Sequence, residues 1–176
     1  LEIVPKRFGD ARGFFSETYS AKVFADHGID LVFVQDNHSY SRDVGTVRGL
    51  HYQRPPHAQA KLVRCGRGRV FDVAVDIRKG SPSYGKWFGA ELSAENGKQL
   101  LIPVGILHGF VTREPDSELL YKCSDVYAPD CDGAVRFDDP DLGIDWGIDV
   151  SAAVLSDKDL NAPLFQNFAT PFVYGH

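Results

Sequence analysis

The chain has 176 residues, of which 43% are hydrophobic and 24% are charged, and its formal net charge is −5 at pH 7. This length fits one domain, residues 1–176, that can bury a stable core without disulfide bonds. The acidic balance argues against general nucleic-acid binding, and no stretch is long and apolar enough for a membrane span, so we expect neither as a partner.

Regular elements are predicted by short apolar runs between Gly, Pro, Asn and Asp. Residues 20–28 predict a helix, with Ser20 as its N-cap, Val23 and Phe24 on an apolar side, and Gly28 at its end. Strand-like runs occupy 31–35, 61–65, 69–77, 98–104 and 117–123. Many short strands with turn residues between them favour an antiparallel sandwich or barrel, and therefore an all-β class.

Alternation is clearest in the run 69–77. Its two faces carry Val70, Asp72, Ala74 and Asp76 on one side and Phe71, Val73, Val75 and Ile77 on the other. We expect one face to be core and the other to carry the two carboxylates. Farther along, the Asp-rich stretch 125–149 predicts an irregular surface excursion, and the apolar chain end, 162–176, is expected to dock against the body.

Cysteine usage indicates the compartment. Cys65, Cys123 and Cys131 form an odd set, and two of them lie within strand-like runs. Reduced, buried thiols are typical of cytosolic proteins, so we expect a cytoplasmic location.

Two segments have the spacing of the cupin signatures. The second signature, G-x5-P-x-G-x2-H, is matched by Gly97, Pro103, Gly105 and His108. Pro and Gly turn the chain sharply between two strands, so that the histidine points into a barrel mouth. The resemblance implies a cupin-type jelly roll, the double-stranded β-helix, with a few short peripheral helices.

The first cupin signature, G-x5-H-x-H followed by glutamate, is matched only in part. His51 follows Gly45 correctly, but Gln53 stands at the second histidine and His57 at the glutamate. A metal-binding cupin combines three imidazoles with a carboxylate, and here the anionic ligand is lost. We therefore expect no metal, although a site of His51, His57 and His108 with Gln53 as a weak ligand stays open.

Further motifs run almost end to end. RGLHYQ (48–53) is followed by Lys61, and the others are DARGFFSE (10–17), VQDNHS (34–39), VFDVAVDIRKGSPSYGKW (70–87), PVGILHGF (103–110), YKCSDVYAP (121–129), DDPDLGIDW (138–146) and LSDKDLNAP (155–163). Together they closely resemble the dTDP-4-dehydrorhamnose 3,5-epimerase family. The resemblance implies an isomerase that inverts C3 and C5 of a dTDP-4-keto-6-deoxyhexose in rhamnose-type deoxysugar biosynthesis.

The implied reaction needs few groups. The protons on C3 and C5 are acidic because both carbons flank the C4 carbonyl, and removal of either gives an enolate. Epimerisation then takes a base on one face, a proton source on the other and a group that holds the oxyanion, with no cofactor. By resemblance His51 is the base, Lys61 holds the oxyanion and Tyr127 is the acid, whereas Tyr121 is expected to be a packing residue.

A carboxylate that holds the other ring nitrogen of the base would fix its tautomer and stabilise the imidazolium. The resemblance assigns this part to Asp159, and Asp157, two residues away, stays open as the alternative. Substrate binding is implied for Arg12, Glu17, Gln35, Asn37, Arg48, Lys61, His108, Asp138 and Lys158. The family also implies a homodimer, in which Arg12 and Glu17 reach the neighbouring site.

Three rival functions remain open at this point. A relative that inverts only C3 or only C5 would use the same base. A metal-dependent cupin enzyme would need a transition metal. A sugar-binding cupin is disfavoured, because simple binding does not need a complete set of acid and base residues.

Overall fold

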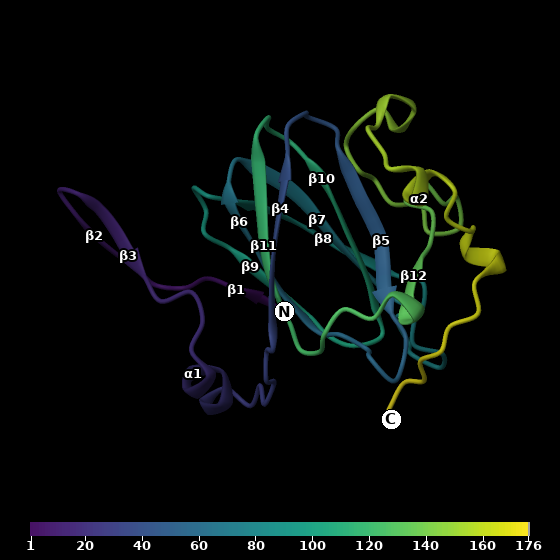
Figure 1. Ribbon diagram of the computed structural model, residues 1–176, viewed down its shortest axis with the longest axis horizontal. Helices are drawn as coiled ribbons and strands as arrows, with labels where there is room; N and C mark the ends of the chain where they lie inside the picture. Colours follow the sequence, from purple (N-terminus) through teal and green to yellow (C-terminus); the bar gives the residue numbers. More distant parts are fainter. Residues whose placement is uncertain (176) are drawn as a thin grey trace.

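The computed structural model describes residues 1–175, and β-strands dominate it (Figure 1). Two five-stranded sheets have the strand orders β1-β9-β6-β11-β4 and β12-β5-β10-β7-β8, and every pair of neighbouring strands in them is antiparallel. A hairpin of β2 and β3 projects from this body (Figure 1). The predicted all-β jelly roll is confirmed. No helix among residues 1–175 is long and apolar enough to span a membrane.

The elements have the following bounds. The first sheet contains β1 (Glu2–Ile3), β9 (Gln99–Ile102), β6 (Lys61–Arg67), β11 (Ser117–Cys123) and β4 (Gln35–Ser41). The second contains β12 (Asp132–Ala134), β5 (Val47–Gln53), β10 (Ile106–Thr112), β7 (Arg69–Asp76) and β8 (Trp87–Ser93). The hairpin is β2 (Arg7–Asp10) and β3 (Gly13–Ser16), and the helices are α1 (Ala21–Asp26), α2 (Asp157–Leu160) and three 3₁₀ turns, Pro129–Cys131, Val150–Ala152 and Phe165–Asn167.

The helix predicted at 20–28 is present, whereas the strand predicted at 31–35 is wrong. Ser20 caps α1 by accepting a hydrogen bond from the backbone of Val23, and Phe24 is buried while Val23 is 45% exposed. Residues 31–34 are not a strand: Leu31 and Phe33 pack beside Phe24 on the outer face of the first sheet. The strand β4 begins only at Gln35, in a polar run whose hydrophobic pattern carries little signal.

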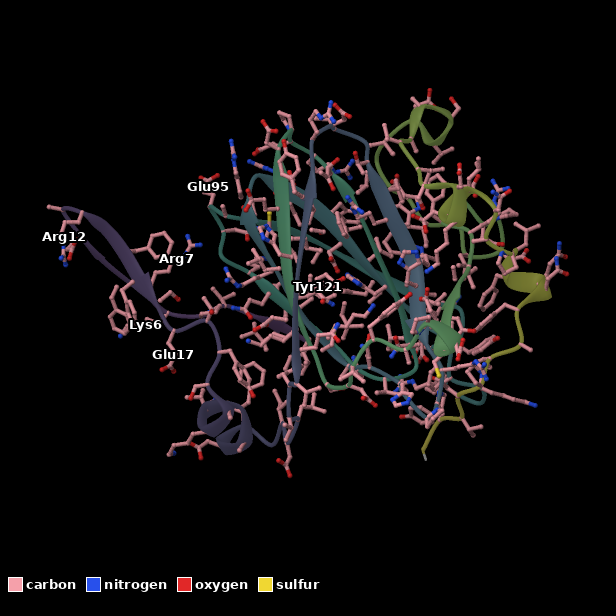
Figure 2. All side chains as sticks on the ribbon, viewed as in Figure 1. Lys6, Arg7, Arg12, Glu17, Glu95 and Tyr121 are labelled. Carbon is pink, nitrogen blue, oxygen red and sulfur yellow. The ribbon has the colours of Figure 1, made fainter. Side chains whose placement is uncertain are left out.

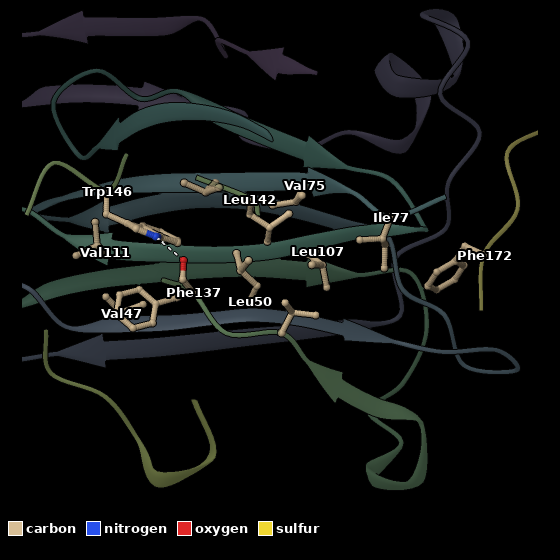
Figure 3. Close-up of a cluster of buried hydrophobic side chains, with 12 residues drawn as sticks. Val47, Leu50, Val75, Ile77, Leu107, Val111, Phe137, Leu142, Trp146 and Phe172 are labelled. Atoms are coloured by element: carbon tan, nitrogen blue, oxygen red, sulfur yellow. Dashed lines mark hydrogen bonds between the residues drawn. The ribbon is translucent and has the colours of Figure 1, made fainter. Parts of the chain in front are cut away.

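Strand β7 is buried on both faces. Its Val70 belongs to a cluster between the two sheets, with Val63, Leu92 and Leu119. The face with Val73, Val75 and Ile77 instead packs under the C-terminal part of the chain (Figure 3). The carboxylate-bearing face is therefore the interior of the barrel, and Asp72 is fully buried there.

The surface excursion predicted at 125–149 is wrong in part, because this irregular stretch covers the second sheet. Phe137, Leu142 and Trp146 are buried against it, and the Trp146 indole N–H donates to the Phe137 carbonyl at 2.8 Å (Figure 3). The chain end docks as expected, with Phe172 buried in the same cluster. His176 lies outside the described residues.

Candidate active site

A cavity of about 440 Å³ opens between the two sheets, beside the buried cluster that joins them. A second cavity, of about 430 Å³, shares His51, Lys61 and Tyr121 with the first. The first is lined by Ser39, Thr46, Val47, Arg48, His51, Lys61, His108, Phe110, Tyr121, Val154, Leu155, Ser156 and Asp159. The motif residues His51, Lys61 and His108 thus meet in one place, although they come from three different strands.

An irregularity in β5 brings Arg48 and His51 to the same side. Strict alternation would place residues three apart on opposite faces. The pairing with β10 shifts between them, however, because His108 pairs with His51 and Phe110 with Arg48. Gly49 permits this: its φ is +133°, and a Cβ there would lie 2.5 Å from the Cα of Gly109.

His51 is held by Asp159. Its Nε2 lies 2.5 Å from Oδ1 of Asp159, whose side chain is 3% exposed, whereas that of His51 is 29% exposed. Ser156 caps α2 by accepting from the Asp159 backbone N–H, which fixes the helix position. The structure therefore places Asp159, and not the exposed Asp157, against His51.

The charge of Asp159 suits this contact. Burial raises the pKa of Asp159, but hydrogen bonds with His51, Ser156 and the backbone of Gly49 outweigh it and leave the pKa below its ordinary value. The carboxylate is thus ionised at neutral pH. It engages Nε2 of His51 and leaves Nδ1 as the ring nitrogen that can act on a substrate.

Lys61 supplies positive charge to both cavities. It begins β6, and its strand partners are Ile102 and Cys123. Burial lowers the pKa of Lys61, and the neighbouring Cys123 and Asp72 partly oppose this lowering. Within residues 1–175 no carboxylate lies within ion-pair distance of its ammonium, so that the cation is available to an anionic group in the cavity.

Two tyrosines face the site differently. Tyr121 on β11 lines both cavities with His51 and Lys61, and burial raises its pKa. Tyr127 is 56% exposed and lines only the second cavity, where its backbone N–H donates to Gln35. Tyr121 is thus more than the packing residue expected from the sequence. Its strand β11 pairs with β6 so that Cys123 lies opposite Lys61, a register that no local sequence signal could have revealed.

The polar end of the second cavity contains several predicted binding residues. Gln35, Asn37 and Lys158 line it. Asp132, which the sequence reasoning missed, lines it as well and forms an ion pair with Lys158. Asp138 is absent from the linings of both cavities and pairs instead with Arg136 at 2.6 Å. The irregular backbone from 125 onward offers no periodicity that could have distinguished these two aspartates.

Arg12 and Glu17 do not line either cavity. Figure 2 shows both on the projecting hairpin arm, apart from Tyr121 on β11. The Arg12 side chain is 89% exposed, and its one ion-pair partner within residues 1–175 is Asp10, its neighbour in the same turn. Within one chain these two predicted residues are therefore remote from the site.

The positions that depart from the cupin pattern have other partners. The Gln53 amide donates to the carbonyls of His57 and Val126 and accepts from the Ala128 N–H. The His57 ring faces Asp125. The site of three histidines left open above is not assembled, and among residues 1–175 no group of three or more His, Cys, Asp or Glu side chains is arranged to hold a metal ion.

Comparison with known proteins identifies the family. Residues 1–167 match the family described as dTDP-4-dehydrorhamnose 3,5-epimerase. The chain belongs to this family. A dTDP-4-dehydrorhamnose 3,5-epimerase of Salmonella typhimurium is 51% identical, over 93% of this chain and 89% of that protein.

Solved structures of epimerases agree with the fold. The Legionella pneumophila epimerase, in complex with dTDP-4-keto-L-rhamnose, has a TM-score of 0.92 and 44% identity and covers 97% of this chain and 92% of that one. A more distant structure is a 3'-monoepimerase from Streptomyces bikiniensis with dTDP, in which one histidine and one tyrosine are replaced. It has a TM-score of 0.86 and 36% identity, and covers 93% of this chain and 81% of that one.

Proposed function

We propose that this member of the family inverts C3 and C5 of a dTDP-linked 4-keto-6-deoxyhexose through an enolate, in rhamnose-type biosynthesis. The observation that carries the proposal is the cavity in which His51, backed by the ionised Asp159, lies with Lys61, which has no ion-pair partner in the described chain, 1–175. These groups supply the base and the cation for the enolate oxygen, and a tyrosine of the same cavity supplies the proton; the C4 carbonyl already acidifies both carbons, so no cofactor is required of the protein.

In the proposed first step Nδ1 of His51 removes the proton from C3 or C5. Electrons of the C–H bond form the enolate, and its oxygen is held by Lys61, whose cation stabilises the developing negative charge. Asp159 stabilises the imidazolium and keeps the base in one tautomer. Return of a proton to the opposite face of the carbon completes the inversion.

We propose Tyr121 as the acid that returns this proton, with Tyr127, the residue indicated by the sequence, as the alternative. Tyr121 is the more buried of the two and lies in both cavities with His51 and Lys61. The two residues replaced in the Streptomyces bikiniensis structure are 70 positions apart, as are His51 and Tyr121 here. Tyr127, at the exposed rim, then has a flat face available for a nucleotide base.

The nucleotide end of the substrate is assigned to the polar part of the cavity. Arg48 lines the first cavity and Lys158 the second, and these two cations suit the diphosphate because phosphate oxygens pair well with such groups. Gln35 and Asn37 offer amide groups to the base. We propose Asp132 in place of Asp138 as the aspartate of this region, since only Asp132 lines the cavity.

We also propose a homodimer that brings Arg12 and Glu17 to the partner's site. The hairpin exposes Phe8, Phe14 and Phe15 at 53%, 60% and 71%, an apolar surface of the kind that associates with another chain. Light scattering during size-exclusion chromatography should give twice the chain mass, and Arg12→Ala should weaken dTDP binding without changing that mass.

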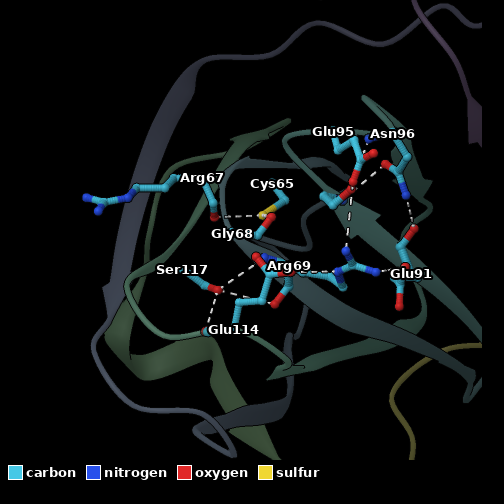
Figure 4. Close-up of polar contacts among 10 residues, drawn as sticks. Cys65, Arg67, Gly68, Arg69, Glu91, Glu95, Asn96, Glu114 and Ser117 are labelled. Carbon is cyan, nitrogen blue, oxygen red and sulfur yellow. Dashed lines mark hydrogen bonds and ion pairs between the residues drawn. The ribbon is translucent and has the colours of Figure 1, made fainter.

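The root of the hairpin is anchored to the body. Arg7 donates to the carbonyls of Ala94 and Glu95 at 2.6 and 2.5 Å, in the turn between β8 and β9. That turn is itself braced, because the Asn96 amide donates to the Glu91 carbonyl while Arg69 pairs with the Glu91 side chain (Figure 4). The arm is thus directed away from its own body, as a dimer contact requires.

A cytoplasmic location is also proposed, supported by three free, buried cysteines.

The test uses proton NMR of dTDP-4-keto-6-deoxyglucose in deuterated water with the enzyme. Loss of the proton signals at both C3 and C5 through exchange is the expected result. Exchange at one carbon would indicate a single-carbon epimerase and contradict the double inversion, and exchange at neither would contradict the epimerase proposal altogether.

A further inference from the structure

Asp72 is a buried carboxylate that the proposed mechanism does not use. It lies on β7, faces the barrel interior and is 0% exposed. Burial of a carboxylate is costly unless hydrogen bonds and opposite charges compensate. Asp76, on the same face, has such compensation from Arg78, Ser81 and Ser83. For Asp72, the only side-chain hydrogen bonds within residues 1–175 come from His108.

The contact with His108 engages both oxygens. Nε2 of His108 lies 3.0 Å from Oδ1 and 2.9 Å from Oδ2 of Asp72. An ionised carboxylate can only accept, so opposite an ionised Asp72 the ring carries its proton on Nε2. This leaves Nδ1 as the one ring nitrogen that can meet a substrate in the cavity, which His108 lines.

His108 lies directly beside the proposed base, His51. In the strand register His108 pairs directly with His51, and the cavity is lined by both rings together with Lys61. Two His–Asp pairs thus stand side by side, His51 with Asp159 and His108 with Asp72. The second pair is the more enclosed, with side-chain exposures of 7% and 0%.

We propose that Asp72 is a positioning residue, which holds the His108 imidazole in one orientation and one tautomer so that Nδ1 meets the reacting sugar. The inference rests on the proposed function and on the substrate contact that the family resemblance implies for His108. Asp72 therefore acts through His108 and does not touch the substrate itself.

The kinetic test compares Asp72→Asn with a matched control, Asp139→Asn. Asp139 is also buried, accepts from the backbone of Leu142 and Phe165, and lines neither cavity. Asp72→Asn should lower kcat by roughly tenfold or more. The loss should stay below the roughly 10²–10³-fold that is typical when an oxyanion donor itself is removed. The dTDP affinity of Asp72→Asn should stay within about twofold of the wild-type value, a change much smaller than the tenfold that corresponds to about 1.4 kcal/mol. Asp139→Asn should lower stability and leave kcat unchanged.

A double-mutant cycle tests whether Asp72 acts through His108. If it does, adding Asp72→Asn to His108→Ala should cost nothing further in kcat. Additive losses, or an Asp72→Asn enzyme with normal kcat, would overturn the proposal.

Nitrogen-15 NMR of the unmodified protein gives a test that does not depend on the variants folding. The account requires Nε2 of His108 to be protonated, and a neutral ring protonated on Nδ1 would overturn it. Failure of the epimerase proposal would be seen separately, as absent deuterium exchange in the wild-type enzyme.

Discussion

Replacement of Asp159 by asparagine removes the charge behind the proposed base and preserves the shape of the side chain. The carboxylate is 3% exposed and contacts His51 at 2.5 Å, so water screens the pair little. Two unit charges about 4 Å apart at an effective dielectric of about 20 interact by about 4 kcal/mol. If that stabilisation of the imidazolium is lost in the transition state, kcat falls by about three orders of magnitude.

The assay is the rate of deuterium exchange at C3 and C5, with dTDP affinity measured in parallel by calorimetry. Asp157→Asn is the matched control, because Asp157 lies in the same four-residue helix but is exposed. The control should retain its rate, and both variants should bind dTDP normally. A rate for Asp159→Asn within tenfold of wild type, or an equal loss in Asp157→Asn, would refute the reasoning.

Three further predictions concern the acid, the core and acid stability. Tyr121→Phe should abolish inversion, whereas Tyr127→Phe, which keeps the flat ring, should leave kcat and dTDP affinity nearly unchanged and Tyr127→Ala should weaken dTDP binding. Loss of kcat in Tyr127→Phe, with kcat retained in Tyr121→Phe, would restore Tyr127 as the acid. Trp146→Ala should lower the free energy of unfolding in urea by about 3–5 kcal/mol, because it empties a fully buried site under the C-terminal layer. Burial raises the pKa of Asp76, but hydrogen bonds from Arg78 and from two serine hydroxyls lower it well below its ordinary value. A depressed folded-state pKa adds stability above the unfolded pKa of about 4 and loses it as pH falls, so Asp76→Asn should flatten the decline in unfolding free energy below about pH 5.

The sequence predicted the parts of the site that short motifs specify. His51, Lys61 and His108 share one cavity because each lies on a strand whose facing is set by local spacing. Asp159 was preferred over Asp157 by resemblance, and the cap at Ser156 explains physically why it faces inward.

Other features depended on tertiary structure. Tyr121 enters the cavity because β11 pairs with β6 in a register that no local pattern reveals. Asp132 rather than Asp138 reaches the site because it lies on β12, which pairs with β5 beside the cavity. Trp146 is buried by the same layer, although an Asp-rich sequence surrounds it. The sequence predicts a strand at 31–35, but β4 begins only at Gln35, because the apolar residues 31–34 pack against α1 instead of joining the sheet.

The central claim is that His51 moves the proton at the carbons beside the carbonyl. The direct measurement is deuterium exchange at C3 and C5 of dTDP-4-keto-6-deoxyglucose with His51→Asn, after calorimetry has shown that this variant binds dTDP like the wild type. The account predicts exchange at both carbons with the wild-type enzyme and none above background with His51→Asn. Exchange at near wild-type rate in the variant would contradict it.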